Sequence, residues 1–199
     1  MLTERAKTLI PKARIVSFEQ WKGFYPNDII ARFQAADDES RYLTNQDLES
    51  LHQAVAASPE LQQVTSSAQI DLAQRLRDQA DTTVSQAREK VLAQYPGITE
   101  PGGDLYPEIR AKACWRDFWQ FLRCVTYGIA AGQAQYTSAE GLHYMELLYQ
   151  ELKVPLQAMV SGIENLKTFS LQSLPTEQQQ LNAPYFDHLI SQLRQFNSA

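Results

Sequence analysis

Apolar residues recur at intervals of three and four along most of the chain, a period typical of amphipathic α-helices. No long alternation of apolar and polar residues marks a β-strand, and only 8 of the 199 residues are glycine. The pattern predicts a helix that begins near residue 27, with Asn27 or Asp28 as its cap. A second helix is expected after Thr44, where Thr44 and Asp47 have the spacing of a capping box.

The apolar stripe then continues from Pro59 to Tyr95, which predicts one long helix that stops at Pro96 and Gly97. The segment 96–107 contains Pro101-Gly102-Gly103 and is expected to be a loop. Residues 1–24 have a mixed pattern without a clear period. Four further helices are expected over about 107–132, 139–154, 156–171 and 176–193.

About eight helices around one core indicate an all-α, globin-like packing rather than an up-down bundle. We expect two N-terminal helices and an extra C-terminal helix in this fold. The predicted organisation is an N-terminal extension over 1–24, a globin-like domain over 25–170 and a C-terminal helical extension over 171–199.

Composition narrows the class of protein. A hydrophobic content of 44% is typical of a globular chain, and a net charge of −5 without a basic cluster argues against nucleic-acid binding. No apolar run reaches the length of a membrane span, and the first residues lack the apolar core of a signal peptide. We therefore expect a cytoplasmic protein.

Cys114 and Cys124 lie on one predicted helix about 15 Å apart, too far for a disulfide.

The densest chemistry lies on the predicted helix 107–132. Cys114, Arg116 and Asp117 place a thiol, a guanidinium and a carboxylate within one helical turn, beside the aromatic residues Trp115 and Phe118. Such a set can tether and orient a flat anionic ligand, although a helical cysteine is more often a small buried apolar residue. Cys124 fits that second interpretation.

The order Cys-x-Arg-Asp, followed by Leu-Arg-x-Val-Thr-Tyr and Ala-Gly, resembles the bilin-attachment helix of the phycobiliproteins. The segments 37–44, 95–106 and 149–155 resemble this family too, in the family's order, and the loop 95–106 is most similar to β-type subunits. The resemblance covers about residues 25–168. It implies a globin-like fold and a light-harvesting protein that is not an enzyme.

The resemblance also implies roles for individual residues. Cys114 is expected to carry a phycocyanobilin-like bilin through a thioether bond, and Asp117 to accept hydrogen bonds from its central rings. Arg116 and Arg110 are expected to neutralise propionates, and Lys112 is a further candidate by position and charge.

Family members pair through their N-terminal helices, where an aspartate of one subunit meets an arginine on the pigment helix of the other. The matching positions here are Asp37 and Arg123, so we expect the chain to pair with a phycobiliprotein subunit or with a second copy of itself. The alternative is that Arg123 extends along the protein surface.

Two functions remain open. In the first, the chain carries a bilin and takes part in light harvesting at the periphery of the thylakoid membrane. In the second, it is a pigment-free or transiently bilin-binding relative that acts on the antenna as an assembly, adaptor or degradation factor. The intact Cys-x-Arg-Asp order favours the first function, whereas the bulky Trp115 and the terminal extensions favour the second. We expect the first function. Haem and metal chemistry are not expected, because His52, His143 and His188 are isolated.

Overall fold

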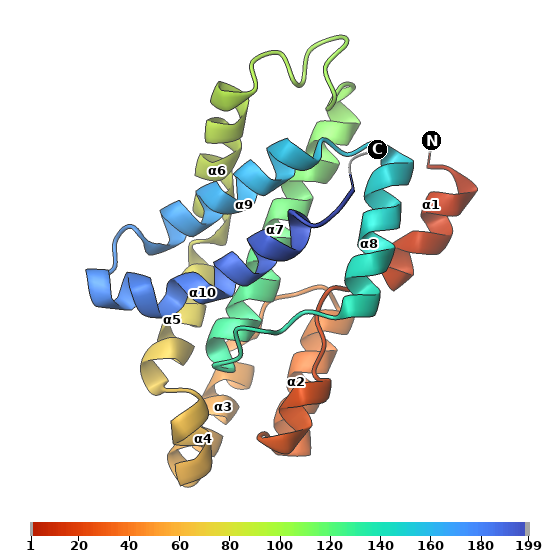
Figure 1. Cartoon of the computed structure of the whole chain (residues 1–199). Helices are drawn as coiled ribbons and strands as arrows, with labels where there is room; N and C mark the ends of the chain where they lie inside the picture. Colours follow the sequence, from red (N-terminus) through yellow and green to blue (C-terminus); the bar gives the residue numbers. More distant parts are fainter. Residues whose placement is uncertain (1, 198–199) are drawn as a thin grey trace.

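The computed structural model describes residues 2–197, which fold as helices joined by loops (Figure 1). The elements in chain order are α1 (Glu4–Leu9), the 3₁₀ helices η1 (Ile10–Lys12) and η2 (Glu19–Gly23), α2 (Asn27–Asp38), α3 (Asn45–Ala57), α4 (Pro59–Val64), α5 (Ser67–Asp78), α6 (Ala80–Gln94), α7 (Glu108–Ala130), α8 (Ala139–Leu152), α9 (Leu156–Leu171) and α10 (Thr176–Leu193). The described part contains no β-strand, only an isolated antiparallel bridge between Val16 and Thr137. The expected all-α, globin-like fold is confirmed.

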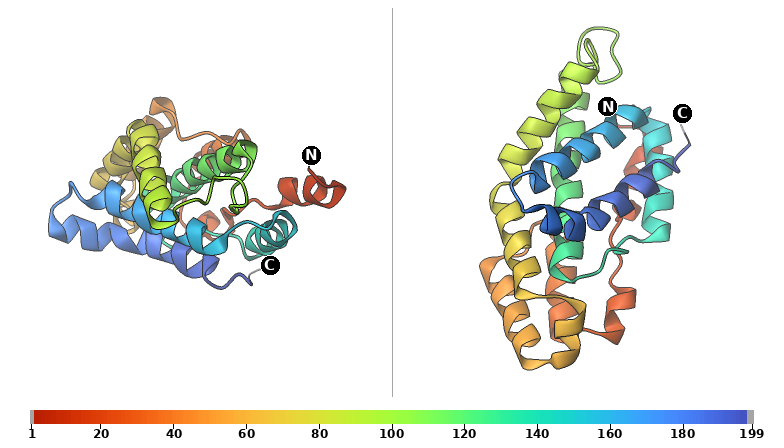
Figure 2. Two further views of the ribbon diagram at one scale, coloured as in Figure 1. Left: turned by 90° about the horizontal axis from the view of Figure 1, so that it is seen from above. Right: turned by 60° about the vertical axis from the view of Figure 1, so that its left-hand side comes forward.

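Helix α7 is the central element of the core. It packs against α5, α6, α9 and α10, and the last two cross in front of it in Figure 1. Its second half is almost entirely buried, and Phe118 has no exposed surface. Gly162 permits the close approach of α9, because a Cβ atom there would lie 2.0 Å from Cζ of Phe118. The views from above and from the side show α7 enclosed by its neighbours (Figure 2).

The predicted long helix over 59–95 is wrong. Three helices, α4, α5 and α6, occupy this range. The first break lies at Thr65 and Ser66, where the Ser66 hydroxyl accepts a hydrogen bond from Gln69 N and caps α5. The Thr65 hydroxyl donates to the carbonyl oxygen of Ala130 at 3.0 Å and so ties this break to the end of α7. The apolar residues keep their spacing of three and four across the break, because each of the separate helices buries one apolar side.

Local signals at other helix ends were more informative. The capping box of Thr44 and Asp47 is present, and α7 begins at Glu108, directly after Pro107. The expected cap of α2 is wrong: Pro26 takes the N-cap position, and neither Asn27 nor Asp28 provides a capping side chain. Pro26 has an extended backbone with ψ 148°, and its carbonyl oxygen accepts the backbone N–H of Ile29 and Ile30 at the start of α2.

Both terminal segments belong to the same hydrophobic core as the predicted domain 25–170. Phe186, Leu189 and Leu193 of α10 are fully buried, and α10 packs on α9 and α7. In the N-terminal segment, Trp21 is fully buried as well. The apolar stripe of α10 therefore completes the cover over α7. In residues 2–197, no helix has both the length and the apolar character that a membrane crossing requires.

Candidate functional site

Cys114 lies in the first half of α7 and faces α9. Only 4% of the residue is exposed, and its Sγ lies 2.9 Å from Sδ of Met159. Burial raises the pKa of the thiol, and the nearby Asp117 carboxylate raises it further. The thiol therefore stays protonated at neutral pH and cannot act as a nucleophile while Met159 covers it.

Asp117 follows one turn later on the same side of α7. Its side chain is 34% exposed, yet the surrounding protein displaces enough water to raise its pKa to about 6, while Arg116 acts in the opposite direction. Arg116 Nη2 lies 3.8 Å from Asp117 Oδ1, and the Arg116 side chain is 71% exposed. Asp117 and Arg116 are thus both accessible, as a ligand with N–H donors and a carboxylate requires.

Tyr149 of α8 completes this site, and sequence reasoning missed it. Its hydroxyl is buried and has no hydrogen-bond partner among residues 2–197. Burial raises the pKa of Tyr149, and the negative charge of Asp117 raises it further. A buried hydroxyl without a partner carries a free-energy penalty that a polar ligand would relieve. The sequence does not show that Tyr149 belongs with α7, because hydrophobic periodicity does not say which distant helices meet.

The two other basic candidates have protein partners. The Arg110 guanidinium donates to the carbonyl oxygens of Asp104, at 3.1 Å, and Lys153, at 2.9 Å, and so ties the 95–107 loop to the end of α8. Lys112 forms an exposed ion pair with Glu108 at 2.8 Å. Two residues before Cys114, Lys112 points to the opposite side of the helix. The structure therefore places Arg110 at the edge of the site and Lys112 outside it.

A surface cavity of about 280 Å³ lies on the other side of α7. Its lining residues are Arg88, Leu92, Thr99, Glu108, Ala111 and Trp115. Trp115 therefore faces α6 and the 95–107 loop, while Cys114 faces α9.

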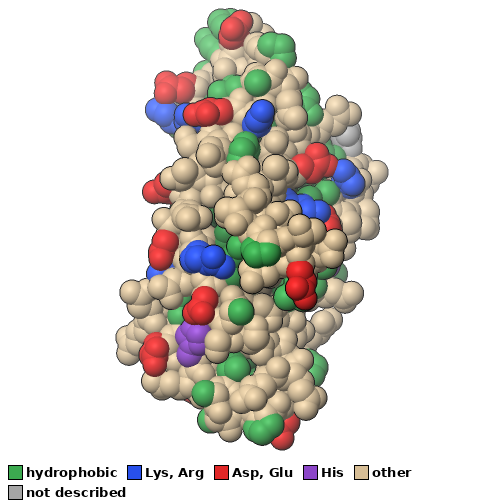
Figure 3. All heavy atoms as spheres, turned by 90° about the vertical axis from the view of Figure 1, so that its left-hand side faces the viewer, with side chains coloured by type: hydrophobic (Ala, Val, Ile, Leu, Met, Phe, Trp, Pro, Cys, Tyr) green, Lys and Arg blue, Asp and Glu red, His purple; other side chains and the backbone are tan. Residues whose placement is uncertain are grey.

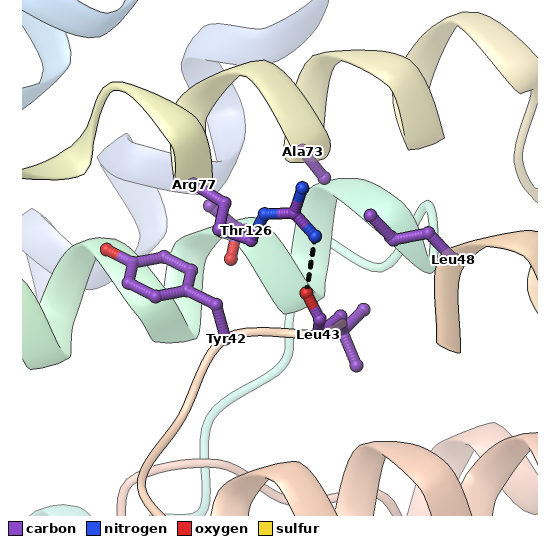
Figure 4. A pocket seen from close by; sticks show the side chains of 6 residues that line it. All are labelled: Tyr42, Leu43, Leu48, Ala73, Arg77 and Thr126. Atoms are coloured by element: carbon purple, nitrogen blue, oxygen red, sulfur yellow. Dashed lines mark hydrogen bonds between the residues drawn. The ribbon is translucent and has the colours of Figure 1, made fainter. Parts of the chain in front are cut away.

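A second hollow lies between Tyr42, Leu48 and Thr126 (Figure 4). Arg77 fills it and donates to Leu43 O at 2.9 Å, which leaves no volume for a water molecule.

Asp37 and Arg123 form an ion pair within this chain, and their contact with a partner subunit stays a prediction. Arg123 Nη1 donates to Asp37 Oδ1 at 2.9 Å, and both side chains are buried, with exposed fractions of 7% and 5%. Arg14 Nε donates to the second oxygen, Asp37 Oδ2, at 3.1 Å. The turn after α2 folds back on α7, and there Tyr127 donates to the carbonyl oxygen of Arg41. This fold-back brings Asp37 to its own Arg123, which therefore does not extend along the surface.

The raised pKa of Asp117 predicts a pH-dependent stability. A carboxyl group whose pKa is higher in the folded than in the unfolded state binds more protons when folded between about pH 4 and 6. Its contribution is fully present below pH 4 and is lost as the pH rises through about 6. The free energy of unfolding of Asp117→Asn, relative to that of the wild type, should therefore rise by about 1 kcal/mol from pH 4 to pH 7. This figure is lowered to account for solvent screening of the partly exposed side chain.

Urea denaturation at pH 4, 5 and 7 measures this difference. Glu108→Gln is the control, because Lys112 lowers the pKa of Glu108 and the difference should have the opposite sign. A constant difference between Asp117→Asn and wild type over this pH range would contradict the prediction.

No cluster of three or more His, Cys, Asp or Glu side chains suited to a metal ion occurs within residues 2–197.

The fold and the site define a globin-like helical protein with a cysteine, an arginine and an aspartate on its central helix. The family model described as phycobilisome protein matches residues 31–193.

Curated relatives agree with the family match. The allophycocyanin subunit alpha-B of Synechocystis sp. is 32% identical over 155 residues, which cover 78% of this chain and 91% of that protein. The alpha-B chains of Synechococcus sp. and Cyanidium caldarium are 34% and 33% identical and are covered to 90% and 94%. The chain belongs to the phycobilisome protein family. Proteins of this family serve light harvesting and are not enzymes.

Two details of the expected resemblance change. The three relatives are alpha-type chains, whereas the 95–106 loop suggested a β-type subunit. A loop of this length is a poor guide to subunit type, because loops vary more than the helices they join. The match also extends to residue 193 and so includes α10, which we expected to be an extension beyond residue 170.

Proposed function

We propose that the chain is a phycobilisome subunit that carries a bilin on Cys114. The observation that carries this proposal is the position of Cys114, Arg116 and Asp117 within one turn of α7, with the Arg116 and Asp117 side chains accessible. The residues fit the chemistry of a bilin, which has a row of N–H donors and two propionates. Asp117 would accept from the N–H groups, and Arg116 and Arg110 would face the propionates.

A bound bilin supplies visible-light absorption. Attachment forms one sulfur–carbon bond: the Cys114 sulfur adds to a carbon–carbon double bond of the pigment, and the thiol proton passes to the neighbouring carbon. Nothing leaves, and no oxidant is needed. Met159 is fully buried and must first move from the sulfur, which requires local repacking between α7 and α9.

A second candidate function is that of a pigment-free relative, which acts on the antenna as an assembly, adaptor or degradation factor. The contact between Cys114 and Met159 favours it, because a thiol held this way is protonated and covered.

The two cysteines of α7 provide a matched test. The wild type, Cys114→Ala and Cys124→Ala would be co-expressed with enzymes that make phycocyanobilin, together with bilin lyases. After denaturing electrophoresis, we expect zinc-induced fluorescence in the wild type and in Cys124→Ala, and none in Cys114→Ala. Cys124 is equally buried on the same helix but lies away from Asp117 and Tyr149, so it controls for the loss of a core thiol.

Absence of covalent pigment in all three proteins would reject the proposal and favour the pigment-free function. Labelling of Cys124 alone would reject the assignment of the site.

We further propose that the chain assembles with phycobiliprotein subunits or with itself, at the cytoplasmic face of the thylakoid membrane. Family members assemble with other phycobiliprotein subunits, which supports this proposal. The face in Figure 3 mixes acidic and basic side chains without a continuous basic area, as suits a protein partner better than nucleic acid.

A further inference from the structure

The surface cavity beside α7 has no part in the proposed attachment of a bilin. Residues of α6, of α7 and of the loop that joins them line it, and this loop forms the top of the molecule in Figure 1. Cys114 faces α9 instead, so a pigment on its sulfur leaves the cavity unused. We call it the α6–α7 cavity; its lining residues are Arg88, Leu92, Thr99, Glu108, Ala111 and Trp115.

The size of the α6–α7 cavity limits what it can hold. Its volume is about 280 Å³. Pockets for drug-sized ligands have volumes of about 300–1,000 Å³, so this one lies at the lower end. It suits a molecule of about two fused rings and is too small for an extended tetrapyrrole.

Trp115 forms a flat wall of the cavity that is fixed in position. Its ring packs against Phe118 with centroids 5.5 Å apart. Phe118 is fully buried and lies in close contact with Gly162 of α9, so it cannot yield to a ligand. Trp115 itself is half-buried, which leaves part of the indole open to the cavity. A planar ring stacks well on such a surface.

Two apolar side chains complete the inner wall. Leu92 of α6 is half-buried and packs against the hydrophobic core, and Ala111 of α7 is 5% exposed. Both are small enough to leave room in front of the indole. The inner part of the cavity therefore favours an apolar, planar group.

The charged side chains at the rim favour an anion. Glu108 is the acidic lining residue, and Lys112 binds it at 2.8 Å and offsets its charge. Arg88 is exposed and forms no ion pair within residues 2–197. A guanidinium binds a carboxylate through two parallel hydrogen bonds, a geometry that a lysine does not offer.

The loop side of the cavity is already in place without a ligand. Leu105 N donates to Ile98 O at 2.8 Å, and Glu100 N donates to Gly97 O at 3.0 Å. These bonds hold Thr99 between them at the cavity, where its hydroxyl can donate or accept a hydrogen bond. A preformed wall lowers the entropy that a ligand must lose on binding.

We propose that the α6–α7 cavity binds a planar aromatic carboxylate of about two fused rings. The rings lie against Trp115, and the carboxylate binds the Arg88 guanidinium. Thr99 provides a further hydrogen bond at the loop. This site is separate from the proposed bilin site and goes beyond the proposed function.

Nuclear magnetic resonance with 2-naphthoate as the probe tests the location of the site. The chain has three tryptophans, so the ¹⁵N-labelled protein gives three indole N–H signals, and Trp115→Leu identifies the signal of Trp115. We expect 2-naphthoate to shift this signal in a saturable way. The signals of Trp21 and Trp119 should stay in place.

Titration calorimetry of variants tests the assigned contacts. Arg88→Gln should weaken 2-naphthoate binding about fivefold, the upper end for an exposed ion pair. Trp115→Leu should weaken it about tenfold, because the stacking surface is lost. Arg75→Gln is the matched control, since Arg75 is an exposed arginine of α5 outside the cavity, and it should bind like the wild type. Circular dichroism checks the helix content of each variant.

A neutral probe tests the class of ligand. 2-Naphthalenemethanol has the same rings and a hydroxymethyl group in place of the carboxylate. It should bind the wild type about fivefold more weakly than 2-naphthoate does, and Arg88→Gln should not weaken it further.

Three results would overturn the proposal. The first is the absence of a saturable shift of the Trp115 signal, or an equal shift of all three indole signals. The second is an equal loss of affinity in Arg88→Gln and Arg75→Gln. The third is equal binding of the alcohol and the carboxylate to the wild type. None of these measurements needs a bilin, so failure here is distinct from failure of pigment attachment.

Discussion

Asp37→Ala is expected to destabilise the protein by about 3–5 kcal/mol, because it leaves the buried cation of Arg123 without its carboxylate. Arg123 Nη1 would keep only the Tyr127 hydroxyl, 2.7 Å away, as an acceptor. The loss arises from an uncompensated charge inside the protein and not from the strength of an exposed ion pair. Urea denaturation followed by circular dichroism measures the change in the free energy of unfolding.

Asp187→Ala provides the control for this prediction. Asp187 pairs with Lys167 at the surface, where more than half of the Asp187 side chain is exposed. Its removal should change the free energy of unfolding by less than about 1 kcal/mol. Equal effects of the two substitutions would show that Arg123 is well solvated, contrary to the structure.

Gly132→Ala is the second substitution with a large expected effect. Gly132 follows the end of α7 with φ +62°, where a residue with a Cβ atom loses about 1–2 kcal/mol. The new Cβ would also lie 1.9 Å from the carbonyl oxygen of Val64, the last residue of α4. Relief requires a backbone shift, which adds about 1–3 kcal/mol. We expect a total loss of about 2–5 kcal/mol in thermal or urea denaturation.

Two other glycines separate these contributions. Gly102 has φ +93° but nothing within 4 Å of an added Cβ, so Gly102→Ala should show only the backbone strain. Gly23 has open space, and Gly23→Ala should change stability by less than about 0.5 kcal/mol. If Gly132→Ala and Gly102→Ala lose the same free energy, the close approach of α7 to Val64 is not rigid.

Much of the candidate site could be predicted from the sequence, because its residues lie within one turn of one helix. Cys114, Arg116 and Asp117 needed only a correct helix assignment, and Pro107 indicated where that helix begins. Tyr149 could not be found this way, since it joins the site from α8. The cover of Met159 over Cys114 joins residues 45 positions apart, and no local pattern encodes it.

The sequence by itself determined the all-α class, the capping box at Thr44 and the glycine- and proline-rich loop before α7. These features depend on residues within about one helical turn of each other, so local backbone preferences decide them. The tertiary structure alone decided that Asp37 binds its own Arg123 and Arg14, that Thr65 interrupts a continuous apolar stripe, and that residues 3–25 cover α2 and α8. Hydrophobic periodicity shows which side of a helix is buried but not which distant segment covers it. That choice depends on packing and charge pairing across the whole fold.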